Sequence, residues 1–229
     1  KTTNAGSEWF NISDDYFKTS SVGAIAVSES DSRIIYVGMG EHSPRGVTTS
    51  YGDGVYKSSD SGKTWEHMGL EKSQQISRII IHPDNNNIIY VAAQGAVNGP
   101  TKERGVYKSM DGGKSWKNIL FVNELSGASE LSIDYNNPKV LYATMWEHQR
   151  LPWKVISGGE GSGVYKSTDG GENWFKIENG LPNELGKLAI SVSRANSDKV
   201  YLLAESDSNK RLGGLFVSNN AGESWSRIS

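Results

Sequence analysis

The 229-residue sequence contains no cysteine, which excludes disulfide bonds and thiolate metal sites. It has no apolar run of membrane-spanning length and no signal-like segment at Lys1. The net charge is −2 and no basic block interleaved with aromatics occurs, so we expect no nucleic-acid partner. No segment carries the apolar stripe of an amphipathic helix over ten residues. The sequence therefore predicts an all-β protein.

One stretch is repeated along the chain and ends each time in tryptophan. It reads GVYKSSDSGKTW at 54–65, GVYKSMDGGKSW at 105–116, GVYKSTDGGENW at 163–174 and GLFVSNNAGESW at 214–225. A shortened copy, KTTNAGSEW, occupies 1–9. A period of about 50 residues in a strand-rich chain is typical of β-propeller blades with four strands each.

The repeated stretch has the pattern of a β-hairpin. Apolar and polar residues alternate before the turn, and a second strand begins at the tryptophan. In the second copy, Asp111 is suited to accept hydrogen bonds from N–H groups of its own turn, and Gly113 can adopt a positive φ. Because the turn already uses these side chains, we interpret them as structural residues and not as metal ligands or catalysts. The equivalent residues are Asn4, Asp60, Asp111, Asp169 and Asn220, followed by Trp9, Trp65, Trp116, Trp174 and Trp225.

The frame S/T-x-D-x-G-x-T/S-W resembles the Asp-box, or BNR repeat. This repeat occurs in sialidases, sortilin-type propellers, xyloglucan-cleaving propeller hydrolases and photosystem assembly factors. Together with the phrases IIYVGMGE and SRIIIHPDNNNIIYVAAQG, the whole chain resembles bacterial secreted sortilin-type (VPS10-like) or BNR-repeat "glycosyl hydrolase" proteins. The resemblance is specific for the repeat and does not select one activity.

Four complete blades are expected, at 23–70, 71–122, 123–180 and 181–229. Residues 1–22 are expected to hold one strand, at 9–12, and the linker of a preceding blade. Because unpaired sheet edges are unfavourable, we expect a part of a larger propeller, with the remaining blades elsewhere in a longer chain or in another subunit. A complete four-bladed ring with an N-terminal tail is the alternative.

The loops between the second and third strands of each blade are long and varied, at 40–53, 94–104, 147–162 and 205–213. They are expected on the face opposite the Asp-boxes, where a rigid scaffold can present a binding site. Glu41, Gln94, Glu147 and Glu205 begin these loops at equivalent positions. The three glutamates are candidate glycosidase carboxylates at the mouth of the axial channel, or ligands of a hard cation. The alternative is that they are solvated and paired with nearby arginines.

Other loop residues are suited to ligand contact. The segment WEHQRLPWK at 146–154 combines two tryptophans with polar groups, which is typical of surfaces that bind sugars or peptides. Trp146 could instead complete its strand, and Trp153 could hold the loop down. The full set of candidate ligand-binding residues is Glu41, His42, Arg45, Gln94, Arg104, Trp146, Glu147, His148, Arg150, Trp153, Glu205 and Arg211.

No known hydrolase motif supports a particular chemistry. G-x-S-x-G and HExxH are absent, and so is the Arg-Ile-Pro string of sialidases. We therefore expect a non-catalytic extracellular propeller that binds a peptide, protein or glycan through the loop face. The alternative is a glycoside hydrolase that uses a channel carboxylate pair. No cofactor or metal is expected, calcium being an alternative without support, and the resemblance implies a secreted, cell-surface or periplasmic location.

Overall fold

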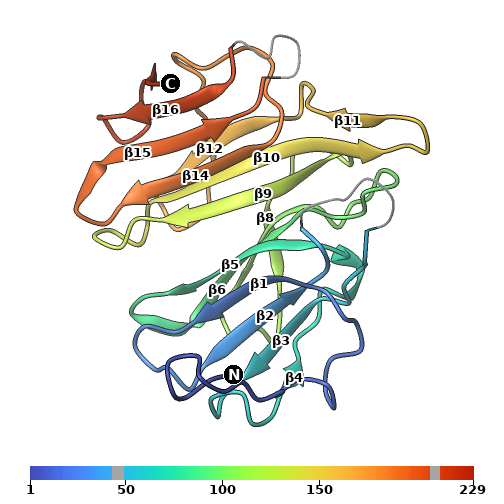
Figure 1. Ribbon diagram of the computed structural model, residues 1–229. Helices are drawn as coiled ribbons and strands as arrows, with labels where there is room; N and C mark the ends of the chain where they lie inside the picture. The colour runs from blue at the N-terminus through green and yellow to red at the C-terminus, as the bar shows by residue number, and fades with distance from the viewer. Residues whose placement is uncertain (43–48, 207–211) are drawn as a thin grey trace.

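Each of the four repeats forms one antiparallel sheet in the computed structural model, which describes residues 1–42, 49–206 and 212–229 (Figure 1). The first sheet contains β1 (Val22–Val27), β2 (Ile35–Met39), β3 (Val55–Ser58) and β4 (Glu66–His67). The second contains β5 (Ile76–His82), β6 (Asn85–Ala93), β7 (Gly105–Ser109) and β8 (Lys117–Leu120). A single 3-10 turn, Glu71–Ser73, is the only helical element of the described residues.

The third sheet contains β9 (Ser126–Ile133), β10 (Leu141–Arg150), β12 (Gly163–Ser167) and β13 (Phe175–Lys176), and β11 (Val155–Ser157) extends it. The fourth contains β14 (Leu188–Ser193), β15 (Asn196–Ala204), β16 (Gly214–Ser218) and β17 (Ser226–Arg227). These sheets are called blades 1 to 4 in chain order. The prediction of an all-β propeller with four consecutive blades is confirmed.

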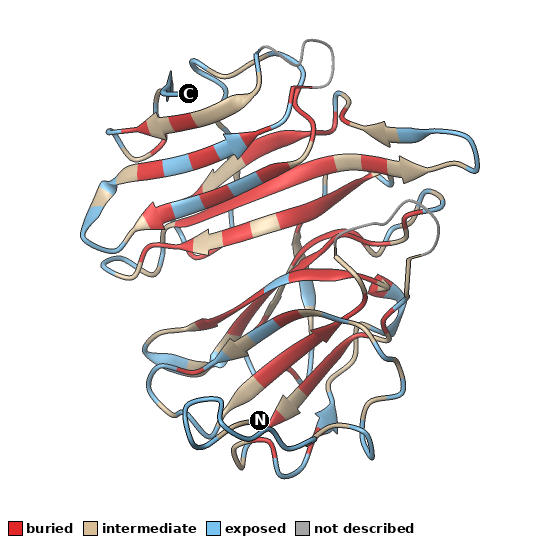
Figure 2. Ribbon diagram, viewed as in Figure 1, coloured by how far each residue is buried: buried red, intermediate tan, exposed pale blue. Residues whose placement is uncertain are grey.

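Hydrophobic cores lie between successive blades. Buried residues form a continuous stretch along β10, whereas they alternate with exposed ones along β14 and β15 (Figure 2). One core joins blades 1 and 2, the next joins blades 2 and 3, and the third joins blades 3 and 4. The first strands β1, β5, β9 and β14 pack against one another in that order. In the described residues we find no substantial strand packing between blade 4 and blade 1, so the ring is not closed by these four sheets. That the chain forms part of a larger propeller stays a prediction.

Each Asp-box turn is held by its own side chains. In blade 2, Ser109 Oγ donates to Asp111 Oδ1 at 2.8 Å and accepts from Gly113 N at 2.8 Å. Asp111 also accepts from Ser115 N at 2.9 Å and from Ser115 Oγ at 2.6 Å. The turn also bonds to the hairpin between the first two strands, since Gly112 N donates to Asn87 O at 2.9 Å. The Asp-boxes and these hairpins therefore share one face of the propeller.

Tyrosine and lysine side chains of one blade bind the Asp-box of the next blade. Tyr142 Oη and Lys166 Nζ both donate to the Ala221 carbonyl, at 2.9 and 2.7 Å. The lysine ammonium also lies 5.7 Å from the centre of the tyrosine ring, within the range of a cation–π contact. The same arrangement is made by Tyr36 and Lys57 on Gly112, and by Tyr90 and Lys108 on Gly170. We call this repeated arrangement the interblade clamp.

The expected strand at residues 9–12 is wrong. The structure assigns no strand to residues 1–21, because this segment has no neighbouring strand with which to form a ladder. The segment lies against blade 1 instead, where Trp65 Nε1 donates to Ile12 O at 2.8 Å and Lys1 Nζ donates to Ser61 O at 2.7 Å. Trp9 remains 73% exposed.

We expect the Asp-box aspartates to make stability depend on pH in acid. Hydrogen bonds hold the pKa of Asp111 and of Asp169 at about 2, below the usual aspartate value. Their contribution to stability is complete above the pKa of the unfolded state and is lost as the pH falls through about 2. Urea denaturation between pH 5 and 2 should show falling stability. The Asp60→Asn, Asp111→Asn, Asp169→Asn triple variant should flatten this dependence, and an unchanged slope would contradict the assignment.

The interblade clamp can be tested with tyrosine variants. Tyr142→Phe removes one donor to the Ala221 carbonyl and should lower the free energy of unfolding by about 1 kcal/mol. Tyr201 occupies the equivalent position of blade 4, opposite Val217 and with no hydrogen-bond partner among the described residues. Tyr201→Phe is therefore the matched control and should leave the urea midpoint unchanged. Equal losses in both variants would refute the clamp.

Candidate functional site at the axial channel

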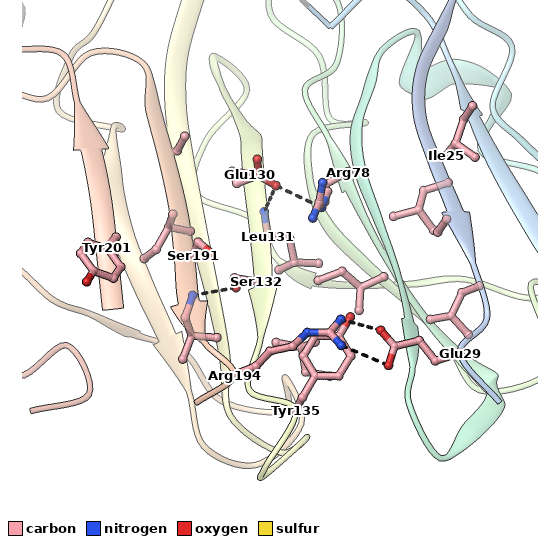
Figure 3. A pocket seen from close by; sticks show the side chains of 18 of the residues that line it. Ile25, Glu29, Arg78, Glu130, Leu131, Ser132, Tyr135, Ser191, Arg194 and Tyr201 are labelled. Carbon is pink, nitrogen blue, oxygen red and sulfur yellow. Dashed lines mark hydrogen bonds and ion pairs between the residues drawn. The ribbon is translucent and has the colours of Figure 1, made fainter. Parts of the chain in front are cut away.

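The first strands of all four blades line a channel of about 600 Å³ (Figure 3). Its walls are largely aliphatic, but charged residues interrupt the strands. Arg78 of β5 and Glu130 of β9 face each other, with Arg78 Nε 3.4 Å from Glu130 Oε1. Burial raises the pKa of Glu130 above its usual value, and the nearby Arg78 opposes this shift only in part. Glu130 thus has the property needed of a carboxylic acid that donates a proton.

An ion pair crosses the channel where β1 and β14 end. Arg194 Nη2 lies 2.5 Å from Glu29 Oε1, and the Arg194 guanidinium stacks 3.4 Å from the centre of the Tyr135 ring (Figure 3). These residues come from blades 4, 1 and 3. Because they follow the first strands, they lie toward the Asp-box face.

Polar side chains from several blades interact electrostatically at the loop-face end of the channel, which we call the axial mouth. His42 of blade 1 forms a hydrogen bond with Gln94 of blade 2, with 2.8 Å between Nδ1 and Oε1. Burial lowers the pKa of His42, and the positive charge of Lys187 on blade 4 lowers it further. Burial also lowers the pKa of Lys187, against the opposing effect of Glu205 and Glu130. Glu130 of blade 3 and Glu205 of blade 4 thus both interact electrostatically with the ammonium group of Lys187.

An aromatic pair borders the axial mouth on blade 3. The rings of Trp146 and His148 stack with their centres 4.0 Å apart, and Lys187 Nζ lies 5.2 Å from the centre of the Trp146 ring. Trp146 Nε1 donates to Ser157 Oγ at 3.1 Å. Trp146 is buried within β10, which continues to Arg150, so Trp146 packs inside the strand and does not end it.

His148 should remain neutral across the physiological range. Burial, together with Arg104, Lys187 and Arg150, lowers the pKa of His148 to about 4. Between this pKa and that of an unfolded histidine, the unfolded state binds more protons, so this residue makes stability fall as the pH falls from about 6.5 to 4. Histidine NMR should show no protonation of His148 above pH 5. A titration midpoint near 6.5 would contradict its burial.

The three candidate glutamates accept hydrogen bonds from nearby loop or strand residues. Glu41 Oε2 accepts from Ser50 N at 3.1 Å, and Glu147 Oε2 accepts from Gly161 N at 3.0 Å. Glu205 Oε2 accepts from Ser157 Oγ at 2.8 Å, which joins blade 4 to blade 3. Of these three glutamates, Glu205 is the one whose charge opposes the lowering of the Lys187 pKa at the axial mouth. Their catalytic role stays a prediction.

The remaining candidates are dispersed. Arg104 is fully buried and donates to the carbonyls of Gln94, Ala96 and Gly99, so it fixes the β6–β7 loop, and the charge of Glu147 acts on it electrostatically. Arg150 lies at the end of β10. Trp153 is 81% exposed in the turn between β10 and β11 and does not hold its loop down. Arg45 and Arg211 lie outside the described residues.

Glu130, Arg78 and Lys187 were not among the residues expected from the sequence. The candidate residues were expected in and beside the loops between the second and third strands of each blade, whereas these three lie in or next to first strands. The available signal was a charge within an otherwise apolar strand, as in SRIII at 77–81 and SELSI at 129–133. Because the first strand of a blade borders the channel, a charge there faces the axis.

No group of three or more histidine, aspartate or glutamate side chains among the described residues could hold a metal ion. Nor does the described part of the chain contain a helix long and apolar enough to cross a membrane.

Comparisons with known proteins agree with the Asp-box resemblance. The family model described as sortilin, neurotensin receptor 3 matches residues 53–154. A xyloglucanase from Paenibacillus sp is 24% identical over 230 residues, which is 100% of this chain and 19% of that enzyme. An ancestral GH74 enzyme superposes with a TM-score of 0.68 at 19% identity, over 91% of this chain and 24% of the other. The GH74 xyloglucanase from Xanthomonas campestris gives 0.63 at 17% identity, over 90% and 29%.

These solved structures show the propeller fold, and the chain spans about a fifth of the curated relative's length. The expectation of a non-catalytic binding module is contradicted, because the curated relative is named as a xyloglucanase and both solved structures are GH74 enzymes. The comparisons favour the alternative, a glycoside hydrolase with a carbohydrate ligand.

Proposed function

We propose that this chain is part of a glycoside hydrolase that cleaves xyloglucan, with the substrate bound across the loop face at the axial mouth. The observation that carries the proposal is the alignment of the entire chain with a xyloglucanase. The site is consistent with it, since Glu130 lines an open channel of about 600 Å³ and interacts electrostatically with Lys187, whose ammonium group lies over Trp146. A xyloglucan-cleaving enzyme needs a place where an oligosaccharide meets two carboxyl groups.

We assign the acid role to Glu130 and the second carboxylate role to Glu205. Burial keeps Glu130 protonated to a higher pH than usual, as a general acid requires. Glu205 Oε2 accepts hydrogen bonds from Ser157 Oγ and from the Lys187 backbone N–H, which hold its carboxylate in a fixed position between blades 3 and 4. Activity should fall as the pH rises through the pKa of Glu130. The reaction is a hydrolysis and requires no redox cofactor.

The location and partners follow from the substrate. Xyloglucan is a polymer, so we place the enzyme outside the cytoplasm. We propose that further blades complete the propeller beyond blade 1 and blade 4, because the described strands of blade 4 do not pack against those of blade 1.

Release of reducing ends from xyloglucan tests the proposal. Glu130→Gln and Glu205→Gln should each lower kcat by a factor of about 100 or more, because each removes a group that transfers a proton or attacks the sugar. Glu66→Gln is a matched control on the exposed strand β4 and should leave kcat unchanged. Each variant's folding is checked by its urea midpoint.

Absence of reducing-end release from xyloglucan by the wild-type protein would refute the function. Full activity in Glu130→Gln would refute only the assignment of the acid and would leave the substrate in place.

A further inference from the structure

The first strands of blades 1, 2 and 3 each contain a β-bulge in their first half, and the extra residues are Gly23, Ser77 and Ser129. In blade 4, β14 pairs with β15 without such a shift at its start. A bulge adds one residue to one strand of a pair and reverses the alternation of side chains beyond it. Bulges of this kind often re-aim a side chain beside a functional site.

The bulge of β9 decides where Glu130 points. Ala128 and Leu131 both belong to the core between blades 2 and 3, although they are three residues apart. Regular alternation from Ala128 would place Glu130 in this core. Because Ser129 is an extra residue, Glu130 lines the channel instead (Figure 3).

The bulge of β5 has the same effect on Arg78. Ile76 and Ile79 both belong to the core between blades 1 and 2, and Ser77 is the extra residue between them. Arg78 therefore lines the channel. Equivalent bulges on neighbouring first strands thus put Arg78 and Glu130 side by side, with 3.4 Å between Nε and Oε1 (Figure 3).

The two bulged serines are bound to the next blade. Ser77 Oγ donates to the Ala128 carbonyl at 2.7 Å, and Ser129 Oγ donates to the Leu188 carbonyl at 3.0 Å. Ser129 is 2% exposed, and its Oγ also lies 2.9 Å from Thr144 Oγ1 on the partner strand. Hydrogen bonds to the neighbouring blade therefore hold both bulges in place.

Two cations act on the carboxyl group of Glu130. They are Arg78 of β5 and Lys187 just before β14, and the residue opposite Glu130 on β10 is the uncharged Thr144. Lys187 directly precedes the residue whose carbonyl binds Ser129. The hydroxyl of Ser129 therefore fixes the carboxyl group relative to both cations.

We propose that Ser129 is a positioning residue for Glu130, because its hydroxyl holds the bulge that turns this carboxyl group out of the interblade core and into the channel beside Arg78. The inference rests on the proposed function for the acid role of Glu130. Misplacement of a reacting group by about 1 Å can lower a rate about 100-fold. Loss of the hydroxyl should therefore lower kcat without weakening substrate binding.

The position of Glu130 can be followed by NMR titration of isotope-labelled glutamate side chains, in which Glu130→Gln identifies the Glu130 signal. Arg78→Met should raise the Glu130 midpoint, because removal of a nearby positive charge disfavours the ionised carboxylate. In the Ser129→Ala background this rise should fall to about half or less, since Glu130 is no longer held beside Arg78. Ser129→Ala should also lower kcat on xyloglucan about tenfold at an unchanged KM.

Ser197→Ala is the matched control. Ser197 Oγ donates to Asp134 Oδ1 at 2.9 Å and also joins blade 4 to blade 3, but on the Asp-box face. This variant should leave kcat and the effect of Arg78→Met unchanged. If Ser129→Ala does not fold by its urea midpoint, Thr144→Val takes its place, because it removes the hydroxyl that Ser129 contacts and should weaken the same coupling.

A full effect of Arg78→Met on Glu130 in folded Ser129→Ala would overturn the inference. So would an equal loss of kcat in Ser197→Ala, or an unchanged kcat in Ser129→Ala when Glu130→Gln is inactive. Full activity of Glu130→Gln, together with a reduced Arg78 effect in Ser129→Ala, would refute the proposed acid alone and support the positioning of Glu130 by Ser129.

Discussion

A single backbone carbonyl in each Asp-box governs how the blades are placed. In blades 2 to 4 this carbonyl belongs to Gly112, Gly170 and Ala221, and it accepts from a tyrosine and a lysine of the preceding blade. The carbonyl can fix the position of the preceding blade only if the turn that carries it is rigid. The aspartate and serine of the same box provide that rigidity by binding the turn's own N–H groups. The hydrogen bonds inside each Asp-box turn therefore also fix the position of the neighbouring sheet.

The repeated structural contacts and the candidate functional residues lie on opposite faces of the propeller. The Asp-boxes, the interblade clamp and the hairpins between first and second strands occupy one face, where their polar groups are satisfied by one another. The Glu29–Arg194 pair spans the channel toward that face. The loop face is left free of such repeated contacts, and there Lys187, Glu130 and Glu205 interact at the axial mouth. A scaffold that is regular on one face can therefore carry irregular, functional groups on the other.

Much of the fold could be predicted from the sequence, because each blade repeats the same turn and the same tryptophan. The strand at residues 9–12 could not, since a strand depends on a neighbour and not only on its own alternation. The hairpin of β10 and β11 was also missed, because residues 147–162 were expected to form a loop. Its pairing, His148 with Ser157 and Arg150 with Val155, extends a strand that was expected to end at Trp146.

The candidate site was predictable only in part. Glu205 could be singled out from the sequence, because it follows the second strand of its blade at the position that Glu41, Gln94 and Glu147 occupy in theirs. The sequence alone could not identify Glu130 or Lys187, because their importance comes from the channel that four separate first strands enclose. A contact between strands far apart in the chain leaves no local pattern.

The central claim is that the Asp-box face is structural and that carbohydrate is bound at the axial mouth. The most direct test is a crystal structure of the Glu130→Gln variant soaked with a xyloglucan oligosaccharide. Our account predicts sugar density over Lys187 and Glu205 at the loop-face end of the channel. Density confined to the Asp-box face, beside residues such as Asp111 and Asp169, would contradict it.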